Sequence, residues 1–317
     1  MKMNLKVYCG LLFMVLLPLD MSFAITAEST SPEGNEASLL STVRYLSEEI
    51  GERSFRDLPK LNKAADYIEN SLHSFGCLVS RQTFTYRGRT YSNVSCEVKG
   101  SNPDKKEILI IGAHYDTAVG TPGADDNASG IAGLLELARL TTLGPAERTI
   151  RFVAFSLEEP PVFGTQDMGS YVYAEQVAQE GVKVYGMISL EMIGYFCEEK
   201  GCQAYPPGVG WLFPDQGNFI SFVGNLSSRS FTQQVRKSFA KASNFPVETL
   251  NTFSSITGVD FSDHQNFWRF GFDAFMVTDT AFNRNRNYHE LEDTWEKLDF
   301  RRLNQMITGL YRAIRSL

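Results

Sequence analysis

The sequence lacks several features that mark other classes of protein. It has no surplus of positive charge, because 30 lysines and arginines face 37 aspartates and glutamates. This balance argues against a nucleic-acid partner. Charged residues make up 21% of the chain, which is close to the globular average and does not suggest extensive disorder. Beyond the N-terminal segment there is no long apolar run, so we expect no stable membrane insertion of the mature chain.

Cysteine is scarce, with five residues in 317. No Cys-x-x-Cys occurs, which argues against a thiolate zinc site. Cys9 lies in the N-terminal apolar segment, and four cysteines then remain, an even number that suggests disulfides in an exported protein. Cys197 and Cys202 flank a short polar loop and are the favoured pair, which leaves Cys77 with Cys96. Four buried thiols are the alternative.

The N-terminus has the pattern of a secretory signal peptide. Lys2 and Lys6 precede an apolar stretch from Val7 to Leu17, and small residues then mark a cleavage site after Ala24. The prediction is therefore a secreted or periplasmic protein. An uncleaved membrane anchor is the alternative, but the apolar run is short for a span.

We predict three segments along the chain: a signal peptide (1–24), a flexible leader (25–37) and a single domain (38–317) that we expect to be monomeric. Strand and helix patterns alternate in the domain, which predicts an α/β fold: a three-layer sandwich with a mixed, mostly parallel central sheet flanked by helices. The expected helices are 39–50, 62–75, 131–140, 171–179 and 300–314, and the expected strands are 79–86, 90–98, 107–112, 149–155, 184–190, 219–223 and 274–278.

Ionisable residues follow these strands at the point where each one ends. In open α/β sheets, ligands bind beyond the carboxyl ends of the strands, so we expect these side chains to meet at one edge. Taken singly, each has an ordinary interpretation, such as a core histidine, a helix cap or a solvated loop. The gathered residues are His114, Asp116, Asp125, Asp126, Glu158, Glu159, Glu191 and His289.

So many carboxylates at one edge would repel each other unless cations lay between them. Imidazole and carboxylate ligands without thiolate suit zinc. The number of ligands suits two zinc ions that share one carboxylate and activate a bridging water. One further carboxylate is then needed as a general base.

The ordered motifs resemble the co-catalytic zinc peptidase family, which includes bacterial secreted leucine-type aminopeptidases and glutamate carboxypeptidase. The resemblance extends from about residue 40 to the C-terminus. It rests on His114-Tyr-Asp116, Gly123-Ala-Asp-Asp126-Asn-Ala-Ser-Gly130, Glu158-Glu159, Leu190-Glu191-Met-Ile-Gly194, Ser262-Asp-His264, Tyr288-His289 and Asp293-Thr294.

The resemblance implies a role for each ligand residue. Asp126 would bridge the two zinc ions, with a cis peptide bond after it. His114 and Glu191 would complete one zinc site, and Glu159 and His289 would complete the other.

Three further roles follow from the same resemblance. Glu158 would be the general base, and Asp116 would orient His114 through its second ring nitrogen. Tyr288 would donate a hydrogen bond to the developing oxyanion, with ordinary aromatic packing as its alternative. The family usually has aspartate where this chain has Glu191. Ser262-Asp263-His264 is interpreted as supporting structure rather than a nucleophilic triad, because a triad must meet in space.

Aminopeptidase action on peptides with a free N-terminus is the favoured function. A glutaminyl-peptide cyclotransferase with one zinc is an alternative, but those enzymes typically have Trp at the position of Tyr288 and Asp at that of Ser262. A binding ectodomain without catalysis is a third possibility. A carboxypeptidase would need a basic cluster, for which Arg284 and Arg286 are the only local candidates, and a solvated loop is the favoured interpretation of both. The aromatic residues that could line a substrate pocket are Phe213, Trp211, Phe253, Phe282 and Tyr195.

Overall fold

The computed structural model describes residues 32–205 and 210–317. The predicted signal peptide lies outside these residues, as does the leader up to residue 31. The end of that leader differs from the prediction: helix α1 already begins at Glu36, and Asn35 caps it by accepting from the Ser38 N–H. The Asn35 N–H donates to buried Glu136. Within the described ranges, no helix has the length and apolarity that crossing a bilayer requires.

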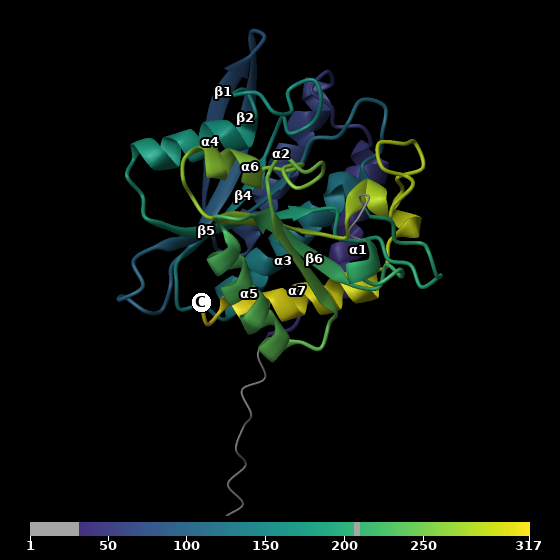
Figure 1. Cartoon of the computed structure of the whole chain (residues 1–317). Coiled ribbons are helices and arrows are strands. Elements are labelled where there is room, and N and C mark those ends of the chain that lie inside the picture. Colours follow the sequence, from purple (N-terminus) through teal and green to yellow (C-terminus); the bar gives the residue numbers. More distant parts are fainter. Residues whose placement is uncertain (1–31, 206–209) are drawn as a thin grey trace, which may run out of the picture. The chain divides into compact units, whose positions relative to one another are not determined.

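Eight strands of the described residues form one mixed sheet, in the order β1-β2-β4-β3-β5-β8-β6-β7. Figure 1 labels β1, β2, β4, β5 and β6 of this sheet. Four of the neighbouring pairs are parallel and three are antiparallel, as the predicted mostly parallel sheet requires. The strands are β1 (Leu78–Tyr86), β2 (Arg89–Val98), β3 (Ile108–His114), β4 (Ile150–Phe155), β5 (Val184–Glu191), β6 (Ile220–Asn225), β7 (Val247–Thr252) and β8 (Ala274–Thr278).

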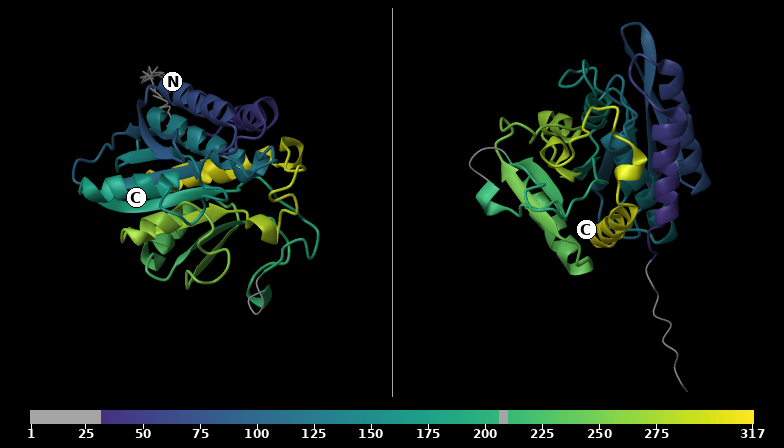
Figure 2. Two further views of the ribbon diagram at one scale, coloured as in Figure 1. Left: turned by 90° about the horizontal axis from the view of Figure 1, so that it is seen from above. Right: turned by 90° about the vertical axis from the view of Figure 1, so that its right-hand side faces the viewer.

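Helices cover both faces of this sheet, which confirms the three-layer sandwich. The larger core contains buried residues of α1, α2, α3, α5 and α7, and α4 and α6 pack on the opposite face. Figure 2 shows α1 and α2, in purple, together on one side. The helices are α1 (Glu36–Arg44, continued by a π-helical segment, Tyr45–Ile50), α2 (Leu58–Ser74), α3 (Gly130–Leu143), α4 (Gly169–Gln179), α5 (Arg229–Ala242), α6 (His264–Arg269) and α7 (Phe300–Ile314).

The sheet reverses direction once on the side of β8. Strands β3, β4, β5 and β8 run parallel, so their carboxyl ends share one edge. Strand β6 is antiparallel to β8, and β7 is parallel to β6. The carboxyl ends of β5 and β8 therefore lie beside the amino ends of β6 and β7.

Both predicted disulfides are present. Cys77–Cys96 joins the residue before β1 to β2, with its Cα atoms 5.8 Å apart. Cys197–Cys202 closes the short polar loop, with a Cα separation of 6.4 Å.

A fully buried arginine holds the loops beneath the edge of the sheet where the ionisable residues gather. Arg53 donates hydrogen bonds to five backbone carbonyls, those of Leu46, Gly51, Tyr115, Pro122 and Gly123. Burial lowers its pKa to about 10, so it stays charged at neutral pH. Gly123 has a φ of +60°, and a Cβ there would lie 2.4 Å from the Asp126 carbonyl oxygen. The turn that leads into Asp126 thus depends on glycine and on Arg53.

Replacing Arg53 with methionine is expected to destabilise the fold by about 3 kcal/mol or more. Methionine fills much of the same space but leaves buried carbonyls without a donor, and each unmade bond of this kind costs about 1–3 kcal/mol. Denaturant unfolding of the variant measures the change. Arg56→Met is the matched control, because Arg56 is exposed. Equal midpoints for the two variants would contradict this role of Arg53.

Candidate metal centre

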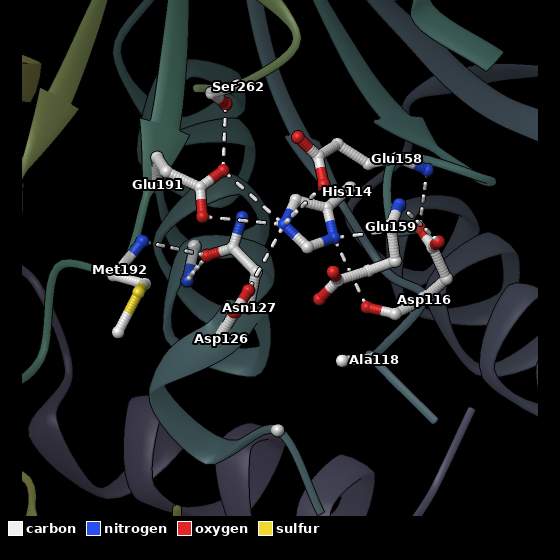
Figure 3. A network of polar contacts seen from close by, with 12 residues as sticks. His114, Asp116, Ala118, Asp126, Asn127, Glu158, Glu159, Glu191, Met192 and Ser262 are labelled. Atoms are coloured by element: carbon white, nitrogen blue, oxygen red, sulfur yellow. Dashed lines mark hydrogen bonds and ion pairs between the residues drawn. The ribbon is translucent and has the colours of Figure 1, made fainter. Parts of the chain in front are cut away.

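The structure brings the predicted ionisable residues together at the carboxyl edge. His114 ends β3, Glu158 and Glu159 follow β4, Glu191 ends β5, and His289 lies in the loop after β8. Figure 3 shows the carboxylates of Glu191, Asp126 and Glu158 converging on the ring of His114. The predicted gathering of these side chains is therefore correct.

Asp126 lies between the two histidines. Its Oδ1 is 3.3 Å from His114 Nε2, and its Oδ2 is 3.2 Å from His289 Nε2. Each histidine also faces a second carboxylate: Glu191 Oε2 is 3.3 Å from His114 Nε2, and Glu159 Oε2 is 3.1 Å from His289 Nε2. This is the arrangement expected of one shared carboxylate between two pairs of ligands.

Two aspartates hold the acidic dipeptides in place through their backbones. The Asp116 carboxylate accepts hydrogen bonds from the N–H groups of Glu158 and Glu159, each at 3.1 Å. In the same way, Asp293 accepts from the N–H groups of Asp125 and Asp126, at 2.9 and 3.1 Å. The Asp293-Thr294 motif is part of the resemblance described above, but the sequence alone does not predict this role of Asp293.

The role predicted for Asp116 is only partly what the structure shows. His114 Nδ1 does face Asp116, but its nearest acceptor is the backbone carbonyl, at 3.1 Å, and the carboxylate is 3.5 Å away. Either contact favours the tautomer that leaves Nε2 free to bind a metal. The carboxylate mainly positions the Glu158-Glu159 segment.

Glu191 is supported by the first residue of the Ser262-Asp263-His264 segment. Ser262 donates to Glu191 Oε2 at 2.7 Å. His264 Nε2 instead lies 2.8 Å from the Val259 carbonyl, and burial lowers its pKa to about 4. Ser262 therefore supports the site, and the three residues do not form a triad, as predicted.

The side chains of the site have strongly shifted proton affinities. Burial opposes protonation of His289, but hydrogen bonds to Asp126 and Glu159 outweigh it and raise its pKa to about 10. Burial, aided by Asp126, raises the pKa of Glu159 to about 7. Burial also raises the pKa of Glu158 well above its ordinary value, against the charge of His114. Protons and a divalent cation compete for these side chains. Metal binding is therefore expected to strengthen as pH rises.

The residues fit divalent metal ions. Ligand atoms of His114, Asp126 and Glu191 lie within 4.8 Å of one another, and so do those of Asp126, Glu159 and His289. Buried Glu159 Oε1 has no hydrogen-bond partner among the described residues, which leaves it available to a cation. Ligand atoms of a third group, formed by His114, Glu158 and Glu159, also lie within 4.8 Å of one another. Nitrogen and oxygen donors without sulfur suit zinc.

The backbone adopts unusual conformations around the ligands. Leu157, Met192 and His289 have φ values of 60°, 47° and 61°. Leu157 precedes Glu158, Met192 follows Glu191, and His289 is itself a candidate ligand, so the uncommon conformations cluster at the site. The peptide bond between Asp126 and Asn127 is cis, as predicted.

Tyr288 joins the metal centre to a neighbouring pocket. Its ring stacks on that of His289, with the centroids 3.8 Å apart. Burial, together with Asp126 and Glu159, raises its pKa, so the hydroxyl keeps its proton and can donate it in a hydrogen bond.

The pocket has a volume of about 100 Å³, and both Glu191 and Tyr288 line it. Among the aromatic residues considered from the sequence, Phe213 and Phe282 line the pocket. Tyr195, Trp211 and Phe253 do not, and the last two are 82% and 66% exposed.

The basic residues considered for a carboxypeptidase do not form a carboxylate-binding cluster. Arg284 is buried and donates to the side chain of Gln203 at 2.7 Å and to the Phe219 carbonyl at 2.9 Å. Arg286 is exposed. Arg284 therefore supports the wall of the pocket.

Fold and site together define a class, the metallohydrolases whose metal centre lies at the carboxyl edge of a mixed α/β sheet. Residues 93–314 match peptidase family M28, and the chain belongs to this family. This confirms the predicted resemblance to the co-catalytic metallopeptidases and the predicted class of enzyme, a peptide hydrolase.

The chain is also similar to two curated proteins. The uncharacterized protein YfbL of Escherichia coli (strain K12) is 39% identical over 312 residues, 95% of each chain. Aminopeptidase YwaD of Bacillus subtilis is 27% identical over 73% of this chain, which spans about half (46%) of the relative's length.

Solved structures share the fold. A zinc aminopeptidase from B. subtilis superposes with a TM-score of 0.70 at 18% identity, covering 90% of this chain and 95% of that one. A glutaminyl cyclase from Bacteroides thetaiotaomicron gives a TM-score of 0.67 at 19% identity, covering 90% and 99%. The fold alone therefore does not separate the two activities.

Proposed function

We propose that the chain is a zinc-dependent aminopeptidase that removes N-terminal residues from peptides with a free amino terminus. The observation that carries this proposal is the position of Asp126, whose two carboxylate oxygens each face a different histidine. A single-zinc cyclase does not require this sharing. The YwaD relative, which is named an aminopeptidase, adds support.

Two zinc ions per chain are proposed, with Asp126 as the shared ligand. His114 and Glu191 would hold one ion, and Glu159 and His289 the other. When bound, zinc lowers the pKa of a coordinated water and polarises the carbonyl of the scissile bond.

Glu158 is the proposed general base. It is buried beside His114, with Oε2 at 3.9 Å from Nε2, and does not belong to either ligand group that shares Asp126. It would take a proton from the attacking water and return it to the leaving amine. The hydroxyl of Tyr288 would donate a hydrogen bond to the oxyanion that develops on the substrate.

We also propose that the protein is exported and acts as a monomer. The two disulfides suit an oxidising compartment. Cleavage of a signal peptide after Ala24 remains a prediction, because that segment lies outside the described residues.

Zinc-dependent cleavage of aminoacyl arylamides tests the function directly. The purified mature chain is expected to hydrolyse substrates with a free amine and to spare those with a blocked amine. Chelation should abolish the activity and added zinc should restore it, because the proposed water activation depends on the metal.

The blocked-amine substrates serve as the internal control. Cleavage of blocked and free substrates alike would contradict exopeptidase action. No cleavage by zinc-loaded protein, together with cyclisation of glutaminyl peptides, would replace the aminopeptidase with the cyclase.

A further inference from the structure

The floor of the pocket beside the metal centre is a row of paired residues across four strands. Glu191 pairs with Thr278, Thr278 with Ser221, and Ser221 with Glu248. All four residues line the pocket. The row begins at a candidate metal ligand on β5 and ends on β7, at the edge of the sheet.

Glu248 is distinguished by its charge. Apart from Glu191, the other described residues that line the pocket carry no ionisable acid or base except the tyrosines. Glu248 is half-buried, and neither a hydrogen bond nor an ion pair joins its carboxylate to another described residue. Burial raises its pKa, and the charge of Arg236 opposes this. A carboxylate in such a place has a desolvation cost that a cationic ligand would offset.

The wall between the two ends of the row is apolar. Val223, Leu250 and Met276 line the pocket and pack around the buried Val259. Tyr205 and Phe213, whose rings stack with centroids 5.5 Å apart, line it as well. Such a wall suits a chain of methylenes, while the far end of the pocket suits a positive charge.

We propose that this pocket receives the side chain of the substrate's N-terminal residue and that Glu248 selects long basic side chains, those of lysine and arginine. The proposal rests on the proposed aminopeptidase function. The peptide to be cleaved would place its first carbonyl near Glu191 and Tyr288, and its side chain would extend along the row toward β7.

The length of the row fits such a side chain. Neighbouring strands lie about 4.8 Å apart, so Glu191 and Glu248 are separated by three spacings, or about 14 Å between backbones. Glu248 lines the pocket at one end of this row. Lysine and arginine combine a flexible aliphatic stem with a terminal cation, which leucine and phenylalanine lack.

The test compares wild type with Glu248→Gln, which keeps the shape and removes the charge. For the zinc-loaded enzyme, kcat/KM is measured with lysyl, arginyl and leucyl arylamides. We expect wild type to prefer the basic substrates, and the lysyl-to-leucyl ratio to fall about 10- to 100-fold in the variant, as for loss of a charged hydrogen bond. Glu180→Gln, an exposed change at the end of α4, is the matched control and should leave this ratio unaltered.

A binding measurement separates failure of the pocket from failure of the enzyme. Calorimetry compares lysinamide with norleucinamide, which lacks only the terminal amine. Tighter binding of lysinamide that disappears in Glu248→Gln would support the pocket even if no arylamide were cleaved. Active enzyme whose lysyl-to-leucyl ratio is the same in wild type and Glu248→Gln would overturn the proposal and leave the aminopeptidase intact.

Discussion

Replacing Glu158 with glutamine is expected to lower kcat by about 10²–10⁴-fold, the usual contribution of a general base. The two side chains have nearly the same size, but an amide cannot accept the proton of the attacking water. Asp116 holds residue 158 through its backbone N–H, and that bond survives the substitution. We therefore expect an enzyme that is folded, binds zinc and has a KM close to that of wild type.

Steady-state kinetics and zinc analysis of the same preparation distinguish a base from a ligand. The control is Glu147→Gln, which removes a partly exposed carboxylate before the amino end of β4, at the opposite end of that strand from Glu158. If Glu158→Gln keeps its zinc and loses less than about tenfold in kcat, another group is the base. If it loses zinc, then Glu158 is a ligand, as the third group of metal-binding residues would allow.

Replacing Asp126 with asparagine is expected to disrupt both metal positions at once. One carboxylate oxygen faces His114 and the other faces His289, whereas an amide offers one neutral oxygen and a nitrogen that does not bind zinc well. Loss of an outer partner of a metal ligand already costs about 10- to 100-fold in affinity or activity. Loss of a shared ligand should cost more, so kcat/KM is expected to fall by more than about 100-fold.

Zinc content after dialysis measures this effect directly. Wild type should retain two zinc ions per chain, and Asp126→Asn should retain fewer. Asp167→Asn, at an exposed position, is the matched control and should match wild type. Two tightly held ions in Asp126→Asn would rule out the bridging role, and a single ion in wild type would favour the cyclase.

The candidate metal centre could be predicted from sequence because its proposed ligands follow buried strands. Strand β8 lies at the predicted residues 274–278, and β5 ends one residue beyond its predicted end, at Glu191 itself. The rule that ligands gather beyond the carboxyl ends then placed the side chains correctly. Helix α7 also matches its predicted range, because its apolar face is regular over 15 residues.

Strand β7 and helices α5 and α6 were not predicted from the sequence, because their hydrophobic patterns are weak or short. No residue of β7 is fully buried, so the apolar runs that reveal central strands are absent there. Helix α5 has only four fully buried residues among 14, and α6 is only six residues long. The pocket floor depends on β7, so the position of Glu248 could not be predicted either.

Contacts between distant segments were beyond prediction for a different reason. Asp116 accepts two backbone hydrogen bonds from residues 42 and 43 positions away, and Asp293 accepts two from residues 168 and 167 positions away. Arg284 is predicted to lie in a solvated loop or to bind a substrate carboxylate, yet it is buried and donates to Gln203 and Phe219. Sequence shows the residue types in such cases, but only the fold shows which partner each one meets.

The reversal of the sheet at β6 also bears on how this enzyme could diversify. The groups proposed for chemistry come from residues 114–191 and 288–293, whereas most of the described pocket lining comes from 203–205 and 213–283. Glu191 and Tyr288 belong to both sets. Mutations in β6, β7 and their loops can therefore alter substrate choice while the hydrolytic machinery stays under separate selection. A laboratory evolution library confined to residues 248–261 would exploit this modularity.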